Sequence, residues 1–449
     1  MQTKKKKYEI DMCNGPLVSK ILLFAIPIAL SGILQQVYNA ADMMVIGRFA
    51  GSNDMAAIGS VSSISGLLVN LFMGLSVGVN ILVARYYSSG QEKDMEETVH
   101  TAISVAILAG AILTVIGLIF ARPLLIRMDT PAEIIDQAVL YMSIYFLAMI
   151  GMLVYNFCAA VLKGVGDTRT SLYILLLSGA LNVVLNLVFV IVFRMGVAGV
   201  AIATVISQYV SAFLVVRTLM KTDASYRLNL KQLRIIPDKL KKMAARGIPT
   251  SIESILFSMA NVLMQSSVNS FGTDIVAGNT AGANIASFAH TAMTCFHQTA
   301  ISFVSQNYSV KQYKRIHRIV LICCGFAVLM GLLLGNGVVL FGEPLLRLYT
   351  DNPEVIFWGK KRLVIMGIPY FLCGLQEVMR GVLRGLDHST LAMIISLVGA
   401  CGLRVLWIFT VFQRFHSYQV LILCLPVSYA LLFIVLFVSY LIILKKQKI

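Results

Sequence analysis

The chain is poor in charged residues, which make up 13% of its 449 positions, and only 21 of them are Asp or Glu. Soluble domains carry about 25% charged and about 45–50% apolar residues. In this chain 58% of the residues are apolar and the mean hydropathy is +0.82. The composition excludes a soluble enzyme, a nucleic-acid-binding protein and a disordered chain, and it indicates a polytopic membrane protein.

Several chemical motifs are also missing. There is no GxxxxGK[ST] phosphate loop, so ATP is not the direct source of energy. The eight cysteines show no CxxC spacing and no associated histidine cluster, so we interpret them as small buried side chains without a metal. HExxH is absent and the acids are scattered. We therefore expect neither an enzyme nor a cofactor.

Long apolar runs are what the chain has instead. They are nearly continuous, as at residues 103–120 and 171–193, and lack the alternation of a membrane β-barrel. About 20 apolar residues cross the roughly 30 Å of hydrocarbon in a bilayer. The runs predict an all-α polytopic membrane protein with twelve transmembrane helices, at residues 17–46, 55–84, 98–120, 134–162, 170–193, 196–216, 247–271, 276–306, 319–341, 355–383, 390–412 and 418–444.

The first run follows the basic stretch Lys4–Lys7. It is longer than the apolar region of about 7–15 residues in a secretory signal, so we expect an uncleaved helix. Most of the 37 Lys and Arg residues fall in loops on the same side as both termini, as cytoplasmic loops do. We expect a multi-pass protein of the cell (cytoplasmic) membrane with both termini in the cytoplasm. The net charge of +16 then reflects topology and anionic lipid head groups rather than nucleic-acid binding.

The basic loop 217–246 separates two halves that resemble each other. Pro27 corresponds to Pro249, and Leu162-Lys163-Gly164 corresponds to Leu383-Arg384-Gly385. Six spans in each half give both halves the same polarity, so we expect a pseudo-two-fold axis along the membrane normal. The predicted organisation is an N-terminal six-helix bundle at 1–216, a basic cytoplasmic linker at 217–246 and a C-terminal six-helix bundle at 247–449. The alternative is a duplicated but static scaffold or channel.

The first span carries a polar face with a carboxylate. Gln35, Tyr38, Asn39 and Asp42 are spaced so that they share one side of a helix. A carboxylate inside a span costs about 2.5–3.5 kcal/mol, and intramembrane acids often mark ion or proton pathways. Asp42 is therefore the main candidate for cation coupling, in the outer half of the membrane. The alternative is a structural acid capped by Asn39 or Tyr38, or an interfacial residue beside Arg48.

Polar stripes also follow the spans 247–271 and 276–306 at intervals of three or four residues. They predict a wetted cavity wall, although small polar residues also pack helices together. The candidate substrate-cavity residues are Gln35, Ser258, Asn261, Gln265, Asn284, Thr291, Thr294 and Gln298. His290 and His297 are interpreted as satisfied core histidines.

A second group of charges lies on the predicted inner side of the C-terminal half. It consists of Glu253, Glu377, Arg380, Arg384 and Arg404. Glu377 and Arg380 are three residues apart and can pair on one helix. Arg404 needs an acidic or carbonyl partner, and Glu377 and Glu253 are the nearest in kind. The group predicts either an inner charge cluster that closes or stabilises this side, or a substrate site.

Pro27 and Pro249 each lie early in the first helix of a half. A proline removes a backbone hydrogen bond and permits a bend, so both are hinge candidates.

Three segments resemble the multidrug and toxic compound extrusion (MATE) family. They are Gln35-Gln36-Val37-Tyr38-Asn39-Ala40-Ala41-Asp42, the segment from Leu162 to Thr170, and the segment from Met195 to Thr204. The resemblance covers essentially the whole chain. It implies an inner-membrane antiporter that expels organic, often cationic and amphipathic compounds in exchange for protons or sodium ions. It also implies that Asp42 is the acid of helix 1 that takes part in cation coupling.

The same resemblance bears on the coupling ion. In one branch of the family an Asn and an Asp of helix 5 assist the helix 1 acid; here Asn182 matches, but Asn186 stands where the Asp is expected. In another branch acids lie deeper in helices 7 and 10, where Glu253 does not match and Cys373 takes the helix 10 position. A neutral Asn186 leaves fewer carboxylates for a sodium shell and favours protons over Na+.

The expected function is thus secondary active antiport with alternating access. The expected partners are small organic substrates and the lipid bilayer, and we expect the protein to work as a monomer. The alternative is a flippase or exporter of a lipid-linked or amphipathic lipid substrate. Such a protein would favour a strongly cationic cavity, whereas the two polar stripes are neutral.

Overall fold

The computed structural model describes residues 8–128 and 130–446, so the stretch Lys4–Lys7 lies outside the described residues. All the regular elements of this described part are helices. The α-helices are α1 (Leu17–Phe49), α2 (Ser52–Ser89), α3 (Glu92–Arg127), α4 (Ile135–Leu147), α5 (Met149–Val165), α6 (Arg169–Leu187), α7 (Gly196–Met220), α8 (Pro237–Asn269), α9 (Thr273–Ser309), α10 (Tyr313–Leu340), α11 (Gly342–Arg347), α12 (Pro353–Gly367), α13 (Tyr370–Gly385), α14 (Ser389–Ser396), α15 (Leu403–Phe409), α16 (Val411–Arg414) and α17 (Tyr418–Lys446). Two π-helical turns, η1 (Val188–Val192) and η3 (Leu397–Gly402), and one 3₁₀ turn, η2 (Leu230–Gln232), complete them.

Each of the twelve predicted spans coincides with helical structure. Within the described residues, nine stretches of helix are long and apolar enough to cross a membrane. Two helix pairs add one bent span each: α4 and α5 meet at 44°, and α12 and α13 at 51°. The remaining predicted span is α9, whose polar stripe lowers its hydropathy although the helix has 37 residues. The all-α polytopic membrane fold is confirmed.

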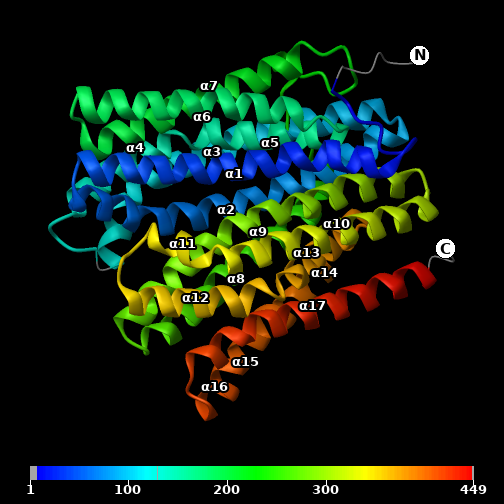
Figure 1. The fold of residues 1–449 in the computed structure, drawn as a ribbon. Helices are drawn as coiled ribbons and strands as arrows, with labels where there is room; N and C mark the ends of the chain where they lie inside the picture. The colour runs from blue at the N-terminus through cyan, green and yellow to red at the C-terminus, as the bar shows by residue number, and fades with distance from the viewer. Residues whose placement is uncertain (1–7, 129, 447–449) are drawn as a thin grey trace. The chain divides into compact units, whose positions relative to one another are not determined.

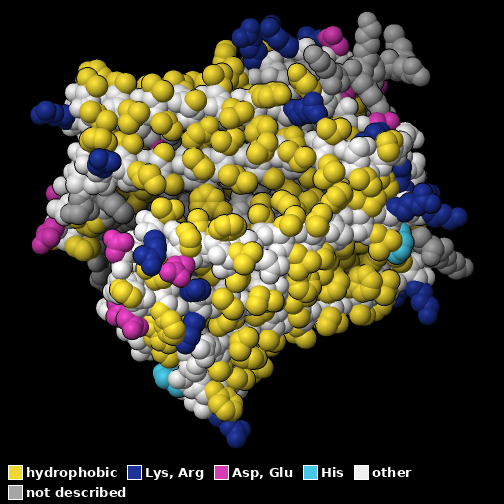
Figure 2. Space-filling view, in the orientation of Figure 1, with side chains coloured by type: hydrophobic (Ala, Val, Ile, Leu, Met, Phe, Trp, Pro, Cys, Tyr) yellow, Lys and Arg dark blue, Asp and Glu magenta, His cyan; other side chains and the backbone are white. Residues whose placement is uncertain are grey.

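The surface is apolar where a soluble protein would be charged. Figure 2 shows hydrophobic side chains spread over the visible face, with Lys, Arg, Asp and Glu gathered towards its margins. Large exposed side chains include Val262, Leu333 and Phe213, each at least 61% exposed. Helices satisfy their own backbone hydrogen bonds, so such a surface is stable in hydrocarbon.

The chain forms two compact units. Unit 1 contains residues 8–10 and Leu30–Ser251, and unit 2 contains Asp11–Ala29 and residues 252–446. In unit 1, α5 packs against α2, α3 and α7, and in unit 2, α9 packs against α10, α12 and α13 (Figure 1). The boundary between the units falls inside α1 and inside α8, not in a loop.

The basic segment before α8 is ordered. α8 begins at Pro237, which suits the first turn of a helix because a proline lacks the N–H that would be unpaired there. Lys239 is 3% exposed; its Nζ bonds Asp94 and lies 3.5 Å from Glu97 Oε2. The helix therefore starts ten residues before the predicted span at 247, in a lysine-rich stretch in which Lys239 is paired with acids of α3.

Candidate functional site

The acid of the first span is held by an amide of α6. Asn186 is 1% exposed, and its Nδ2 donates a hydrogen bond to Asp42 Oδ1. The same nitrogen lies 3.4 Å from the Oδ1 of Asn182, one turn earlier on α6. Among the described residues Asp42 has no Lys, Arg or His within ion-pair distance. Asp42 is thus a half-buried carboxylate with neutral hydrogen-bonding partners.

Tyr38 aligns α1 with α6 one turn before Asp42. Its hydroxyl lies 3.5 Å from the Leu176 carbonyl, and its ring fills the space that a side chain at Gly179 would occupy. Contacts therefore rise in residue number along both helices, so α1 and α6 run parallel here. This is the relation expected of the first and fifth spans of one half.

Two residues near Asp42 were not anticipated from the sequence. The rings of Tyr141 and Tyr145 on α4 stack with centroids 5.7 Å apart, and both lie within electrostatic range of Asp42. A tyrosine pair four residues apart on the fourth span was the available signal. The structure does not bring Gln35 or Asn39 into this group, since both side chains are exposed.

The polar stripes of α8 and α9 contain two kinds of side chain. Three hydroxyls bond to carbonyls of their own helix: Ser258 to Ser254 at 3.0 Å, Thr291 to Ser287 at 3.0 Å and Thr294 to Thr291 at 2.8 Å. These hydroxyls have acceptors without water, so they are compatible with packing as well as with a cavity.

The amides of the stripes behave differently. Gln265 Nε2 donates to Asn269 Oδ1 at 2.9 Å, and Asn279 Nδ2 donates to Gln265 Oε1 at 3.4 Å. Asn284 is exposed and Gln298 is half-buried. Asn261 contacts Arg404. The predicted substrate-cavity residues of unit 2 therefore do not form one continuous network.

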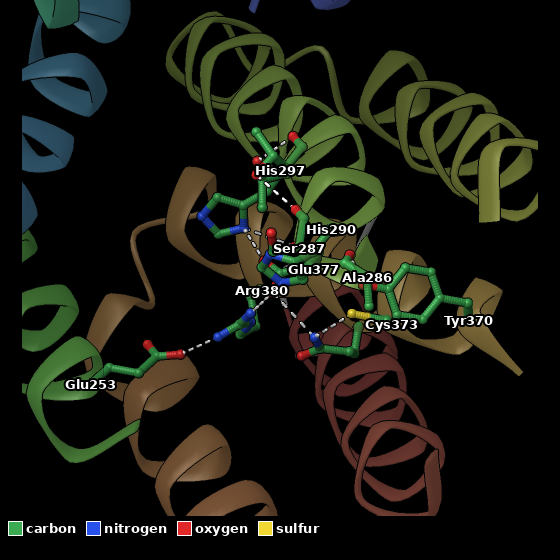
Figure 3. A network of polar contacts seen from close by, with 12 residues as sticks. Glu253, Ala286, Ser287, His290, His297, Tyr370, Cys373, Glu377 and Arg380 are labelled. Atoms are coloured by element: carbon green, nitrogen blue, oxygen red, sulfur yellow. Dashed lines mark hydrogen bonds and ion pairs between the residues drawn. The ribbon is translucent and has the colours of Figure 1, made fainter. Parts of the chain in front are cut away.

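Four of the five residues predicted as an inner charge cluster contact one another, and Figure 3 shows Glu253, Glu377 and Arg380 among them. Arg380 bridges two buried acids, with its Nη1 2.6 Å from Glu253 Oε1 and its Nη2 bonded to Glu377 Oε1. The predicted pair of Glu377 with Arg380 is confirmed. Arg384 Nη2 lies 2.5 Å from the other oxygen of Glu253. Two acids and two arginines balance each other in this cluster.

His297 completes the cluster and shows its protonation state. Arg384 Nη1 lies 2.9 Å from His297 Nε2, and because a guanidinium only donates, Nε2 must accept. The ring proton then lies on Nδ1, which donates to the Glu377 carbonyl at 2.9 Å. Both ring nitrogens of His297 thus have hydrogen-bond partners, as predicted for a satisfied core histidine. His290 is half-exposed, with its Nε2 3.8 Å from Glu377 Oε1.

Arg404 lies outside this balanced group. Its Nη1 donates to the amide oxygen of Asn261 at 2.9 Å, and its guanidinium carbon lies 5.5 Å from the centre of the Phe257 ring. The prediction left open an acidic partner, with Glu253 and Glu377 as candidates, or a carbonyl partner. The structure shows the second, because the partner is the amide carbonyl oxygen of Asn261. Phe257 was missed, although it follows Glu253 by four residues and precedes Asn261 by four, which places all three on one face of α8.

The two hinge candidates lie inside continuous helices. Pro27 is within α1 and Pro249 is within α8. The broken spans of the described chain are at Ala148, between α4 and α5, and at 368–369, between α12 and α13. Among described residues no three His, Cys, Asp or Glu side chains are arranged to hold a metal ion.

Known proteins share this organisation. A family model described as MatE matches the chain twice, at residues 27–188 and 249–410. The chain is 26% identical to "Probable multidrug resistance protein YoeA" of Bacillus subtilis, over 100% of this chain and 99% of that protein. It is 26% identical to "Probable multidrug resistance protein NorM" of Thermotoga maritima, covering 84% of this chain and 82% of that protein. It is also 22% identical to the "FAD transporter" of Shewanella oneidensis, covering 86% of each.

The fold is likewise similar to that of solved transporters. A multidrug resistance MATE family transporter of the MOP superfamily, solved in an outward-facing conformation, superimposes with a TM-score of 0.92 at 19% identity. The match covers 99% of this chain and 100% of that one. Two family matches that together span most of both halves, in a chain with the same fold, make this protein a member of the MATE family of membrane transporters.

Proposed function

We propose that the protein is a secondary active antiporter that exports organic, often cationic and amphipathic compounds in exchange for protons. The observation that carries this proposal is the bond from Asn186 to Asp42, a carboxylate within a span that has no basic partner among the described residues. Without a fixed counter-charge, such an acid can exchange a proton for a cationic compound. Two amides and no second carboxylate leave little for a stable sodium shell.

The proposed cycle follows the charge of Asp42. A proton arriving from outside neutralises the carboxylate, so its attraction for a cationic compound falls and the compound leaves. Asn186 donates to the charged acid, so protonation also weakens this bond between α1 and α6. Each charge moved across the membrane is worth about 2.3 kcal/mol per 100 mV, enough to bias two states of similar energy. Pro27 and Pro249 are the proposed hinges for that change.

This mechanism requires the arrangement expected from the sequence. We propose six-helix bundles at 1–216 and 247–449, joined by the linker 217–246, with both termini in the cytoplasm and a single chain as the functional form. Tyr38 would assist Asp42, and Asn182 would act through Asn186, whereas Gln35 is proposed as a cavity residue. The cavity residues proposed are Ser258, Asn261, Gln265, Asn284, Thr291, Thr294 and Gln298.

Everted membrane vesicles test the coupling. Uptake of a cationic dye is measured under an imposed proton gradient and then under an imposed sodium gradient. We expect proton-driven uptake in the wild type and its loss in Asp42→Asn, with Asp136→Asn, an exposed acid of α4, as the matched control. Full proton coupling in Asp42→Asn refutes the role of Asp42, and uptake driven by sodium alone refutes the choice of ion.

A lipid or lipid-linked substrate is the second candidate. The observation that favours it is the arginine content of unit 2, where Arg380, Arg384 and Arg404 are buried or half-buried. Flipping of a fluorescent phospholipid in proteoliposomes, measured by dithionite quenching, separates the two. Flipping that depends on Arg404 would replace the antiport of soluble compounds as the function.

A further inference from the structure

Arg404 is a buried arginine with only neutral partners. The residue is 3% exposed and lies on α15. Its contacts are the amide oxygen of Asn261 and the face of Phe257, and its Nε is buried with no hydrogen-bond partner. Among the described residues no carboxylate lies within ion-pair distance of it. The amide of Asn261 and the ring of Phe257 thus stabilise the charge of Arg404 in part, but no carboxylate neutralises it.

The acids of unit 2 that are buried nearby are already paired. Glu253 is shared by Arg380 and Arg384, and Glu377 is bonded by Arg380. Arg380 is itself 5.5 Å from the ring of Phe257, on which Arg404 also rests. The charged neighbour of Arg404 across this ring is therefore a second cation. The five charged side chains of this region, Glu253, Glu377, Arg380, Arg384 and Arg404, therefore carry one positive charge in excess.

A second arginine shows the same pattern. Arg362 Nη1 donates to Asn279 Oδ1 at 2.5 Å, an oxygen that also accepts from Tyr418 at 3.1 Å. Arg362 Nε is buried and without a partner. Among the described residues Arg362, like Arg404, has no carboxylate within ion-pair distance. Unit 2 thus contains two guanidinium groups that are bonded to asparagine and have no acidic partner.

The backbone next to Arg404 also indicates a functional site. The π-helical turn η3 ends two residues before Arg404. Such turns interrupt the regular helix and occur frequently at functional sites. An unneutralised charge within a span is also costly and is retained mainly where it has a role. The exposed side chain of Asn261 is a neutral acceptor, and a carboxylate or phosphate oxygen would bond a guanidinium about twice as strongly.

We propose that Arg404 binds an anionic group, a carboxylate or a phosphate, of the transported compound. The group displaces the amide of Asn261 and also accepts from the unpartnered Nε donor of Arg404. The substrates preferred by this transporter are then zwitterions, which carry an anionic group for Arg404 beside the cationic centre that the Asp42 cycle requires, rather than simple cations. This inference rests on the proposed export of organic compounds and specifies their chemical class.

Binding of a matched dye pair tests the inference. The probes are a rhodamine with a free carboxylate and its ethyl ester, which share a fluorophore and a cationic centre. Fluorescence anisotropy is measured with the full chain in nanodiscs of neutral phosphatidylcholine. We expect the wild type to bind the acid more tightly than the ester. Arg404→Gln should weaken binding of the acid by about tenfold, or about 1.4 kcal/mol, and leave the ester unchanged.

Two variants separate binding from folding. Arg404→Lys keeps the charge and should retain part of the preference for the acid, and Arg414→Gln, an exposed arginine of α16, should bind as the wild type does. Equal affinity of the wild type for both dyes overturns the inference. So does an equal loss of both dyes in Arg404→Gln, because that result indicates a structural role. The assay needs no ion gradient, so its outcome is independent of the Asp42 coupling test.

The source of the anion is tested in the same assay. Anionic phosphatidylglycerol is added to the nanodiscs in place of part of the neutral lipid. We expect the preference for the carboxylate dye to remain. Competition by phosphatidylglycerol that disappears in Arg404→Gln would assign the site to a lipid head group and overturn the assignment to a transported compound.

Discussion

Asp42 in unit 1 and Arg404 in unit 2 are charges of opposite sign, and among the described residues each lacks an oppositely charged partner. In both cases an asparagine provides the hydrogen bond: Asn186 donates to Asp42, and Asn261 accepts from Arg404. An amide can donate or accept, so the same residue type supports charges of either sign. The comparison teaches that two halves with the same architecture differ in the sign of their uncompensated charge while using the same neutral side chain to hold it.

The largest expected effect breaks the balanced cluster of unit 2. Glu253→Gln leaves Arg384 without a carboxylate, and removal of one partner from a buried pair costs about 3–5 kcal/mol. We expect a correspondingly lower free energy of unfolding, measured by thermal denaturation of the purified protein in detergent. Glu343→Gln is the control, because the side chain of Glu343 is 43% exposed and pairs with Arg347 and Lys360.

The control residue Glu343 also has a shifted pKa, so its ion pairs contribute to stability as well. Hydrogen bonds from Arg347 and Lys360 hold the pKa of Glu343 below its usual range. Its contribution to stability is present above the pKa of the unfolded chain and lost as pH falls through the folded value. If Glu253→Gln and Glu343→Gln lower the free energy of unfolding equally at neutral pH, the buried ion pairs of Glu253 do not stabilise unit 2 more than a surface pair does.

Replacing Arg404 with a neutral residue should not lower the free energy of unfolding, in contrast to Glu253→Gln. Arg404→Met removes an uncompensated charge, so the free energy of unfolding should stay the same or rise by about 1 kcal/mol. Arg384→Met removes the partner of Glu253 and should lower it. The measurement is the difference in melting temperature between the two variants. Equal destabilisation would mean that Arg404 is as fully paired as Arg384, and the contrast between the units would be lost.

A second carboxylate beside Asp42 should change the preferred ion. Asn186→Asp places two acids together, which suits a bound cation and opposes the loss of both protons. We expect a sodium gradient to drive severalfold more dye uptake in this variant than in the wild type, measured in everted vesicles. Asn53→Asp adds a carboxylate at an exposed position of α2 and should leave the ion preference unchanged. No gain of sodium coupling in Asn186→Asp would show that the amide does not decide the ion.

The smallest effect is expected at Asn182. Its Oδ1 lies 3.4 Å from Asn186 Nδ2 and does not touch Asp42. Side-chain hydrogen bonds inside membrane proteins average about 0.6 kcal/mol, so Asn182→Ala should lower stability only slightly and preserve proton-driven uptake. Loss of coupling as complete as in Asp42→Asn would move Asn182 into direct contact with the ion.

The twelve spans could be predicted because hydrocarbon imposes one requirement on all of them, an apolar helix of sufficient length. The span 276–306 was predicted from its apolar run like the others, although the polar stripe of α9 lowers its hydropathy. The bend at 368–369 has a sequence signal in Pro369, but the bend at Ala148 has none. It depends on packing between α4, α5 and their neighbours, which residue type does not encode.

The candidate sites were predictable to different degrees for a similar reason. Glu377 and Arg380 lie on one helix, so their spacing predicted their pairing. The partner of Arg404 comes from another helix, and the choice between acid and amide depends on which helices are neighbours. Tyr141, Tyr145 and Phe257 were missed because aromatic residues in a span are ordinary packing material, and only their contacts distinguish them.

The unit boundaries inside α1 and α8 have a consequence for fragments of the chain. Residues 11–29 belong to unit 2, and the start of α8, up to Ser251, belongs to unit 1. Each unit therefore includes a segment from the other half of the sequence. Cleavage between α7 and α8 would leave neither fragment with all the residues of one unit, so we expect that neither fragment folds alone.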